Sequence, residues 1–224
     1  MKETIEDYLK IIFQLEREEG KVATTVLARR LGLAPGSVTG MLKKLSEMNL
    51  VNYTPYQGVR LTASGKKIAL EVIRHHRLIE LFLAEALGVP WDRVHEEAEK
   101  WEHVLSEDLE DRIDEILGYP TNDPHGSPIP DRSGAFPEHF STRLSDLEAG
   151  QKASIAEVAD EDPELLRYLA DLGLFPNTEV RVEEVAPFEG PITVQVGERT
   201  HALGRKVAHQ IFVKDVKTES EDEH

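Results

Sequence analysis

The 224-residue sequence contains no cysteine, and it has only three methionines and two tryptophans. Without cysteine the chain forms neither disulfide bonds nor thiolate–metal bonds, so any metal site must use imidazole and oxygen ligands. No apolar run approaches the roughly 18 residues needed to span a bilayer. The N-terminal stretch MKETIEDYLK also lacks the apolar core of a signal peptide. We therefore expect a cytoplasmic protein with no membrane partner.

Basic residues are fewer than acidic ones, 26 against 42, and the formal net charge is -16 at pH 7. The charge is distributed unevenly along the chain. Residues 21–74 carry nine lysines and arginines against two acidic residues, a charge of +7 that leaves -23 for the rest. An acidic protein is a poor partner for nucleic acid, whereas a basic segment neutralises DNA phosphates. The distribution indicates a basic module attached to an acidic body.

The basic segment has the element order of a winged helix-turn-helix. Apolar residues recur at helical spacing over residues 3–19, and Gly20 ends that helix. A short helix capped by Thr24 or Thr25 follows, and GLAPG separates it from a second helix that starts at Pro35. The stretch LVNYTPYQGVRLT then predicts two short strands with a turn at PYQG. The alternative is a generic small α/β module with a basic surface.

If this module binds DNA, its second helix is the recognition helix. Small residues open that helix and would face base edges, namely Pro35, Gly36, Ser37 and Thr39. Basic residues nearby would neutralise phosphates, namely Arg29, Lys43, Lys44 and Arg60. The predicted contact set also includes the residues at the start of the first short helix, Thr24 and Thr25.

Beyond the module, apolar spacing predicts a long helix from Ala63 to about Leu87, capped by Thr62 or Ser64, and helices over residues 91–105 and 107–117. The stretch GYPTNDPHGSPIPDRSGAFPEHF is either a linker or an ordered, non-helical crossing. From Leu144 the pattern changes to short strands with one helix, which predicts a small β-barrel. The polar tail KTESEDEH predicts disorder.

Ligand-type side chains concentrate in HEEAEKWEHVLSE, residues 95–107. A helix turns by about 100° per residue, so one arc about 100° wide would hold His95, Glu99, Glu102 and His103. The long helix adds a pair one turn apart, His76 and Glu80, and the first helix adds Asp7. Each piece alone is also typical of a solvated helix face. Together, and interleaved with apolar residues, the carboxylates need a cation to offset the cost of burial, which favours a divalent-metal site.

The stretches RHHRLIE, VHEEAEKWEHVLSEDLEDRI and DPHGSPIP resemble signature stretches of the diphtheria-toxin-repressor family of metal-dependent transcriptional regulators. The resemblance implies a primary metal site formed by Asp7, Glu99, Glu102 and His103. It implies an ancillary site formed by His76, Glu80 and His95, completed by an acidic residue from Glu161, Asp162 or Glu164. Asp7 and Glu99 match the manganese-responsive branch, so manganese(II) is the expected cofactor, iron(II) the second, with other divalent transition metals possible in vitro. Where the short manganese regulators have a glutamate this chain has Lys10, which argues against their closely spaced two-metal cluster and implies either two separate sites or a variant arrangement.

The resemblance also implies the architecture and the partners. The expected fold is mainly α with a C-terminal β-barrel. The domains are a winged helix-turn-helix at residues 1–74, a helical metal-binding and dimerisation domain at 75–142, an SH3-like domain at 143–217 and a disordered tail at 218–224. The expected protein is a homodimeric repressor that binds double-stranded operator DNA of manganese or iron homeostasis genes when loaded with metal. Without metal the carboxylates would repel one another, and the first helix, with the winged helix, would be free to shift. Metal would join Asp7 to the dimerisation helices and so select the orientation that binds DNA.

Two other functions compete with this interpretation. A winged-helix regulator that senses a non-metal signal would use the acidic helix only as a solvated dimer surface. A metallohydrolase is suggested by HEEAE, which resembles the His-Glu-x-x-His zinc motif, but Glu99 stands in place of its second histidine. We expect neither enzymatic activity nor a small-molecule substrate.

Overall fold

Contacts between residues divide the chain into two units, which we describe separately. The structure is a computed structural model, and it describes residues 2–136, 141–159 and 162–218, without the side chains of Glu18 and Glu19. The first unit combines residues 1–76 with Trp101–Ser106 and Pro130–Ala135. The second combines Arg77–Lys100, Glu107–Ile129 and Phe136–His224. The domain boundaries expected from the sequence stay predictions.

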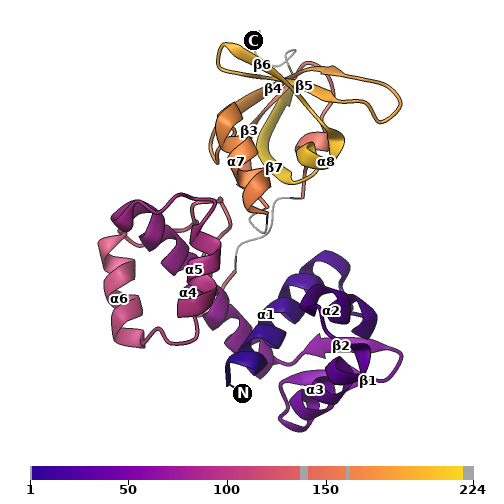
Figure 1. Cartoon of the computed structure of the whole chain (residues 1–224), viewed down its shortest axis with the longest axis vertical. Helices are drawn as coiled ribbons and strands as arrows, with labels where there is room; N and C mark the ends of the chain where they lie inside the picture. The colour runs from indigo at the N-terminus through magenta and orange to yellow at the C-terminus, as the bar shows by residue number, and fades with distance from the viewer. Residues whose placement is uncertain (1, 137–140, 160–161, 219–224) are drawn as a thin grey trace. The chain divides into compact units, whose positions relative to one another are not determined.

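The first unit contains the predicted winged helix-turn-helix, in which three helices precede a two-stranded wing (Figure 1). Its elements are α1 (Lys2–Glu19), α2 (Thr24–Leu31), α3 (Pro35–Glu47), β1 (Val51–Thr54) and β2 (Gly58–Leu61). The strands pair antiparallel, with Val51 opposite Leu61. Apolar residues from each helix are fully buried and form the core, among them Leu9, Ile12, Leu27, Val38 and Leu42. The winged helix-turn-helix prediction is confirmed.

The start of α2 differs from the prediction. Ala23, in extended conformation, is the residue before the helix, and no side chain caps it. Thr24 and Thr25 lie inside the helix instead, so the predicted cap is wrong. The cap of the long helix α4 (Ala63–Leu87) is as predicted, because the Thr62 hydroxyl accepts a 3.1 Å hydrogen bond from the Gly65 amide. Only glycine fits at that position, since a Cβ there would lie 2.0 Å from the Leu50 carbonyl oxygen.

In the second unit, α4 continues and is followed by α5 (Val94–Trp101) and α6 (Glu107–Ile116). Helix α5 is shorter than the predicted helix over residues 91–105, and Glu102 and His103 lie in the turns after its end. The prediction that all four ligand-type residues share one helical arc is therefore wrong. None of the described helices is both long enough and apolar enough to cross a bilayer.

The proline-rich stretch is an ordered, non-helical crossing where the structure describes it. Asp123 Oδ1 accepts hydrogen bonds from the amides of His125 at 2.8 Å and Ser127 at 3.0 Å. The His125 carbonyl in turn accepts from the Val158 amide at 2.9 Å. Gly126, with φ of 90°, packs so tightly on the following domain that a Cβ would lie 2.1 Å from the Ala156 carbonyl oxygen.

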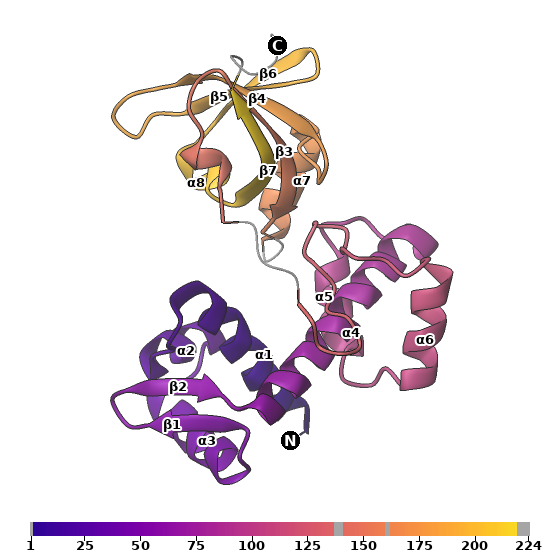
Figure 2. The same ribbon diagram turned by 180° about the vertical axis from the view of Figure 1, so that it is seen from behind.

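The C-terminal part of the second unit is an antiparallel sheet in the order β6-β5-β4-β3-β7 (Figure 2). Its elements are η1 (Leu144–Asp146), β3 (Gln151–Val158), α7 (Pro163–Leu172), β4 (Glu179–Val185), β5 (Ile192–Val196), β6 (Arg199–Leu203), α8 (Arg205–Ala208) and β7 (Ile211–Thr218). Apolar residues of the strands and of α7 bury a common core, among them Ile155, Val182, Val194, Leu166 and Leu169. In the described residues β6 and β7 are the edges of the sheet, so it is open and the term barrel was too strong. The predicted disordered tail starts too early, because β7 continues through Lys217 and Thr218. The rest of the tail, from residue 219 onward, lies outside the described residues.

Candidate metal centre and DNA-binding surface

Glu102 is the centre of the first cluster of ligand-type side chains. Its carboxylate is fully buried, and Lys10 of α1 donates a hydrogen bond of 2.6 Å to Oε1. His76 of α4 donates to the other oxygen, Oε2. Burial raises the pKa of Glu102, but the hydrogen bond from His76 and the charges of His76 and Lys10 outweigh that effect and hold the pKa below its usual value. Glu102 is therefore kept as a carboxylate inside the protein.

His103 connects Glu102 to α1. Its Nε2 lies 2.9 Å from Asp7 Oδ1 and 3.4 Å from Glu102 Oε1. Asp7, Glu102 and His103 each offer one ligand atom, and these atoms lie within 4.8 Å of one another. One imidazole nitrogen and two carboxylate oxygens fit a borderline or hard divalent ion. The structure thus brings three of the four predicted primary-site residues together.

Glu6 is a site residue that the sequence analysis missed. Its Oε2 lies 2.8 Å from His103 Nδ1 and so accepts a hydrogen bond from the ring. A carboxylate on one ring nitrogen fixes the tautomer and leaves the other nitrogen available to a metal. Here that other nitrogen is Nε2, which faces Asp7. The only signal in the sequence is that Glu6 adjoins Asp7, and exposed acids are common in the first turns of helices.

Glu99, the fourth predicted primary-site residue, does not belong to the group of Asp7, Glu102 and His103, but its carboxylate forms another metal-type group with Glu102 and His76, with ligand atoms within 4.8 Å of one another. Its side chain is 44% exposed, and its carboxylate is 3.8 Å from His95 Nε2 on the same helix. The cluster of Asp7, Glu102 and His103 is formed without it. The part of Glu99 in metal binding stays a prediction.

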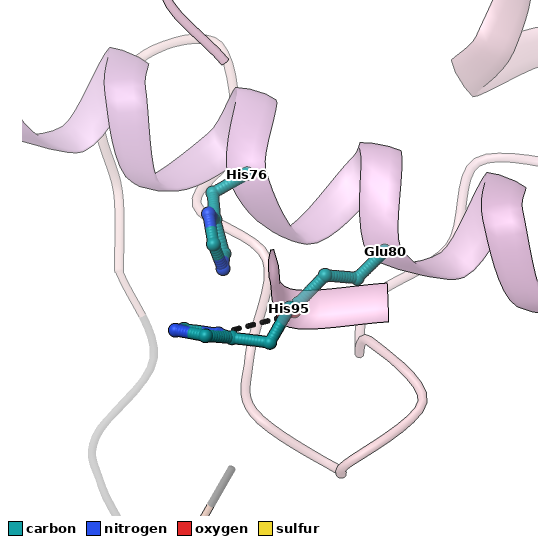
Figure 3. Close-up of side chains that lie close together, drawn as sticks. All are labelled: His76, Glu80 and His95. Carbon is teal, nitrogen blue, oxygen red and sulfur yellow. Dashed lines mark hydrogen bonds and ion pairs between the residues drawn. The ribbon is translucent and has the colours of Figure 1, made fainter. Parts of the chain in front are cut away.

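The predicted ancillary residues also lie close together, as Figure 3 shows. His76 and Glu80 are one turn apart on α4, and Glu80 Oε1 accepts a 3.1 Å hydrogen bond from His95 Nδ1. The three residues offer ligand atoms within 4.8 Å of one another. His76 and Glu80 are buried and His95 is half-buried, so this cluster is not a solvated helix face.

A third cluster, formed by Glu80, Asp123 and His125, was missed by the sequence analysis. All three residues are buried, and His125 Nδ1 lies 3.9 Å from Glu80 Oε2. His125 Nε2 is 2.9 Å from the Trp91 carbonyl oxygen, and the two rings stack with centroids 5.6 Å apart. Glu80 therefore presents one oxygen to His95 and the other to His125. Helical spacing could not predict that Asp123 and His125 join this cluster, because both residues lie in the non-helical crossing.

Three acidic residues of the C-terminal domain were predicted as candidates to complete the ancillary metal site, namely Glu161, Asp162 and Glu164. Asp162 is the N-cap of α7, since its Oδ1 accepts from the amides of Glu164 at 2.9 Å and Leu165 at 3.3 Å. Asp162 and Glu164 are exposed, and neither belongs to a metal-type cluster in the described residues. Glu161 lies outside the described residues.

Most of the predicted DNA-contacting residues are exposed in the first unit. Pro35, Gly36 and Ser37 are exposed at the start of α3, while the Thr39 hydroxyl donates a 2.8 Å hydrogen bond back to the Pro35 carbonyl. The remaining predicted contacts are exposed, namely Thr25, Arg29, Lys43 and Arg60, or half-buried, namely Thr24 and Lys44.

Gly40 adds to this face and was not predicted. A Cβ at Gly36 or Gly40 would meet no atom within 4 Å, so neither glycine is required by packing inside the protein. The two residues are one turn apart and present bare backbone on the same side of α3, which suits close approach to another molecule.

Comparisons with known proteins agree with these features. Three family models match consecutive parts of the chain: the DNA-binding domain of iron-dependent repressors at residues 1–59, their metal-binding and dimerisation domain at 62–131, and the FeoA domain at 142–215. The iron-dependent repressor IdeR of Mycobacterium leprae is 33% identical over 226 residues, covering 96% of this chain and 98% of that protein. The diphtheria toxin repressor of Corynebacterium glutamicum is 31% identical, covering 96% and 97%.

A solved structure of a manganese-dependent transcriptional repressor in complex with manganese is 39% identical. It superimposes with a TM-score of 0.86, covering 93% of this chain and 98% of that chain. The chain therefore belongs to the iron-dependent repressor family and is a metal-dependent, DNA-binding transcriptional repressor, built from a DNA-binding domain, a metal-binding and dimerisation domain and an SH3-like FeoA domain.

Proposed function

We propose that this repressor responds to manganese(II), which Asp7, Glu102 and His103 hold, and acts in the cytoplasm as a homodimer on operators of manganese or iron homeostasis genes. The observation that carries the proposal is the convergence of three ligand atoms from α1 and residues 101–106 within 4.8 Å. The bound ion supplies positive charge that two carboxylates share.

The choice of manganese rests on the donor set. The site offers oxygen and imidazole nitrogen without sulfur, and the chain has no cysteine to supply any. Oxygen ligands suit manganese, whereas sulfur ligands favour softer ions. The solved relative with 39% identity is named for manganese, while two sequence relatives are repressors named for iron or for diphtheria toxin. Iron(II) is the second candidate.

We assign a second metal site to Glu80. Two sets of partners are in reach: His95 with His76, and Asp123 with His125. The first set corresponds to the ancillary site implied by the sequence, for which Glu161, Asp162 and Glu164 are the additional candidates. The second set is buried completely and lies on the crossing that continues into β3.

Helix α1 transmits the state of the primary site to the DNA-binding elements. Asp7 lies near one end of α1, and Glu16 near the other end accepts a 3.0 Å hydrogen bond from the Leu61 amide of β2. If Asp7, Glu102 and His103 held one divalent ion, they would fix the position of α1 relative to residues 101–106. Through Glu16, that position also fixes the wing, and metal binding and DNA binding are coupled reciprocally.

The mechanism expected from the sequence needs one revision. It held that α1 is released whenever the carboxylates are not bridged by metal. Side chains alone already join α1 to residues 101–106, through the pairs Lys10–Glu102 and Asp7–His103. Asp7, Glu102 and His103 would therefore hold the ion at a preformed contact, which lowers the conformational cost of binding.

In the proposed complex α3 lies in the major groove, and its exposed start, Pro35, Gly36 and Ser37, faces base edges. Few long hydrogen-bonding side chains are present there, so shape and deformability of the operator carry much of the specificity. Basic side chains around the helix neutralise phosphates, namely Arg29, Lys43, Lys44 and Arg60.

Fluorescence anisotropy on a labelled fragment of the upstream DNA tests the proposal. Chelator-treated protein is titrated with manganese, with iron(II) under anaerobic conditions, and with magnesium, at one fixed salt concentration. We expect tightening with manganese at the lowest concentration, then iron, and none with magnesium. Asp7→Ala should raise the manganese concentration needed for half-maximal DNA binding by about tenfold or more, because the metal site loses a ligand from α1.

The control is Glu3→Ala, which removes an exposed acid from the first turn of α1. It should leave the response unchanged. A normal manganese response from Asp7→Ala, or equal DNA binding with and without metal, would contradict the assignment of the primary site.

A further inference from the structure

The wing ends in a fully exposed tyrosine, Tyr56, whose relative accessible surface is 107%. It lies in the loop between Thr54 and Gly58, which are the last paired residues of β1 and β2 on that side. Figure 1 shows this hairpin projecting from the first unit beside α3. A ring this exposed adds nothing to the core of the first unit.

The backbone of Tyr56 is in the left-handed region, with φ of 63°. The Gln57 amide donates a 3.0 Å hydrogen bond to the Thr54 carbonyl, so Pro55 and Tyr56 are the central residues of a β-turn. Proline followed by a residue with positive φ is the pattern of a type II turn, in which glycine or asparagine normally takes the second place. A bulky side chain there costs free energy that glycine would not. The fold thus holds an aromatic ring where neither packing nor turn geometry requires one.

The base of the wing is fixed, so the position of its tip is defined. The Val59 amide donates a 2.9 Å hydrogen bond to the Val22 carbonyl, which pairs the segment after α1 with β2. Gly58, with φ of 96°, packs so tightly on that segment that a Cβ would lie 2.5 Å from the Val22 carbonyl oxygen. A rigid hairpin loses little conformational entropy when its tip meets a partner.

The charge around the wing suits an anionic partner. No acidic residue occurs between positions 48 and 70. Arg60 is exposed on β2, and Lys21 is exposed beside Gly58, where a Cβ would lie 3.6 Å from the lysine Cγ. The carboxylate of Glu16 accepts a backbone hydrogen bond at the opposite end of β2 from the tip. The wing therefore presents a neutral aromatic ring together with two cations, and it continues the DNA-binding surface of α3.

We propose that Tyr56 is a DNA contact additional to those of α3 and of the basic side chains. Its ring packs against deoxyribose beside the base pairs that α3 contacts, and its hydroxyl donates a hydrogen bond to a phosphate oxygen. The inference rests on the proposed placement of α3 in the major groove. Tyrosine is among the side chains that bind phosphate oxygens in protein–DNA complexes. Because the side chain is neutral, this contact adds affinity without releasing counterions.

Fluorescence anisotropy on the labelled upstream fragment at saturating manganese tests the contact. Tyr56→Ala should weaken DNA binding by about tenfold, because each dimer loses two rings and two hydrogen bonds. The slope of log affinity against log salt should stay the same. Tyr56→Phe keeps the ring and should lie between the alanine variant and the native protein. Unchanged affinity of Tyr56→Ala would overturn the inference.

The matched control is Tyr168→Ala, which makes the same change at an exposed tyrosine of the C-terminal domain. It should bind DNA as the native protein does. A loss as large as that of Tyr56→Ala would overturn the inference, because the effect would then not depend on the wing.

Two further measurements separate a DNA contact from a structural role. Hydroxyl-radical footprinting reports the exposure of deoxyribose, and at protein concentrations that saturate both proteins Tyr56→Ala should leave open sugars that the native protein covers. Tyr56→Gly relieves the left-handed turn, so it should weaken DNA binding without lowering the melting temperature. Identical footprints, or a lower melting temperature of Tyr56→Gly, would overturn the inference.

Failure of the proposed placement of α3 gives a different result. If α3 does not enter the groove, Gly40→Ala leaves DNA binding unchanged. If only the Tyr56 contact is absent, Gly40→Ala still weakens DNA binding while Tyr56→Ala does not.

Discussion

Glu102 joins three charged or polar partners while being excluded from solvent, so we expect its removal to be costly even without metal. Glu102→Gln would leave the Lys10 ammonium buried beside a neutral amide, and the loss of one partner of a buried ion pair costs about 3–5 kcal/mol. Urea denaturation in the presence of chelator measures this difference. Asp7→Asn is the matched control, since that side chain is 39% exposed and its change should cost less than about 1 kcal/mol. Equal losses for both variants would contradict the central role of Glu102.

Glu6 offers a second test at the scale of the residue. Glu6→Ala should weaken manganese binding by roughly 10- to 100-fold, since it removes the acceptor that orients a ligating histidine. Glu6→Gln keeps an oxygen acceptor for His103 Nδ1 and should recover most of the affinity. Isothermal titration calorimetry with manganese compares the two. Equal affinity of the alanine variant and the native protein would show that the His103 ring is held by other contacts.

Some residues of the metal-type clusters could be predicted from the sequence, and others could not, for a physical reason. Asp7, Glu102 and His103 were predictable because two of them lie in a dense acidic and imidazole stretch and all three matched a family pattern. The role of Glu6 and the pairing of Lys10 could not be predicted. The sequence of a helical turn does not show whether a charged residue is exposed or buried. Asp123 and His125 depend on a tertiary path through the crossing that no local spacing encodes.

Among the elements, α3 contains a glycine, Gly40, that should lower the stability of the helix while it favours DNA binding. Glycine inside a helix costs roughly 0.5–1 kcal/mol relative to alanine, and nothing within 4 Å restricts a Cβ at Gly40. Gly40→Ala should therefore raise the free energy of unfolding by about that amount, while it weakens operator binding because the added methyl group holds α3 away from the groove.

Thermal denaturation and anisotropy at saturating manganese measure the two effects of Gly40→Ala. Ser46→Ala is a control on the same helix, away from its exposed start. Tighter or unchanged DNA binding by Gly40→Ala would place the DNA contact elsewhere than the start of α3.

Element identities were more predictable than element ends. The order of helices and strands followed from apolar spacing, but α5 ends at Trp101, four residues earlier than predicted at Leu105. The chain leaves the helix there, and Glu102 and His103 take turn conformations in which their side chains meet Lys10, His76 and Asp7. Tertiary pairing of charged groups thus overrides a helical pattern that would otherwise continue.

For the whole molecule, the charge asymmetry predicts a strong salt dependence of operator binding. Each phosphate neutralised by a lysine releases counterions, so log affinity falls with log salt by a slope of about 0.9 per contact. Lys43→Ala should lower that slope by about one contact and weaken binding to all sequences alike. Lys206→Ala, at an exposed lysine of the C-terminal domain, should change neither. Anisotropy titrations at several salt concentrations give both slopes, and equal slopes for Lys43→Ala and the native protein would remove Lys43 from the phosphate contacts.

The architecture as a whole was predictable from composition and order, with one exception. Strand content and turns indicated an all-β domain at the C-terminus, but closure depends on whether the first and last strands of the sheet meet. The pairing order β6-β5-β4-β3-β7 is a long-range property, so the sequence could not distinguish an open sheet from a barrel.

The Lys10–Glu102 pair has a consequence for how such a repressor changes over evolutionary time. Lysine and glutamate codons differ by a single base at the first position, and the same substitution reverses the charge beside Glu102. One transition mutation thus separates a buried ion pair from two adjacent buried carboxylates, so the charge that α1 presents to Glu102 is a heritable trait set at one codon.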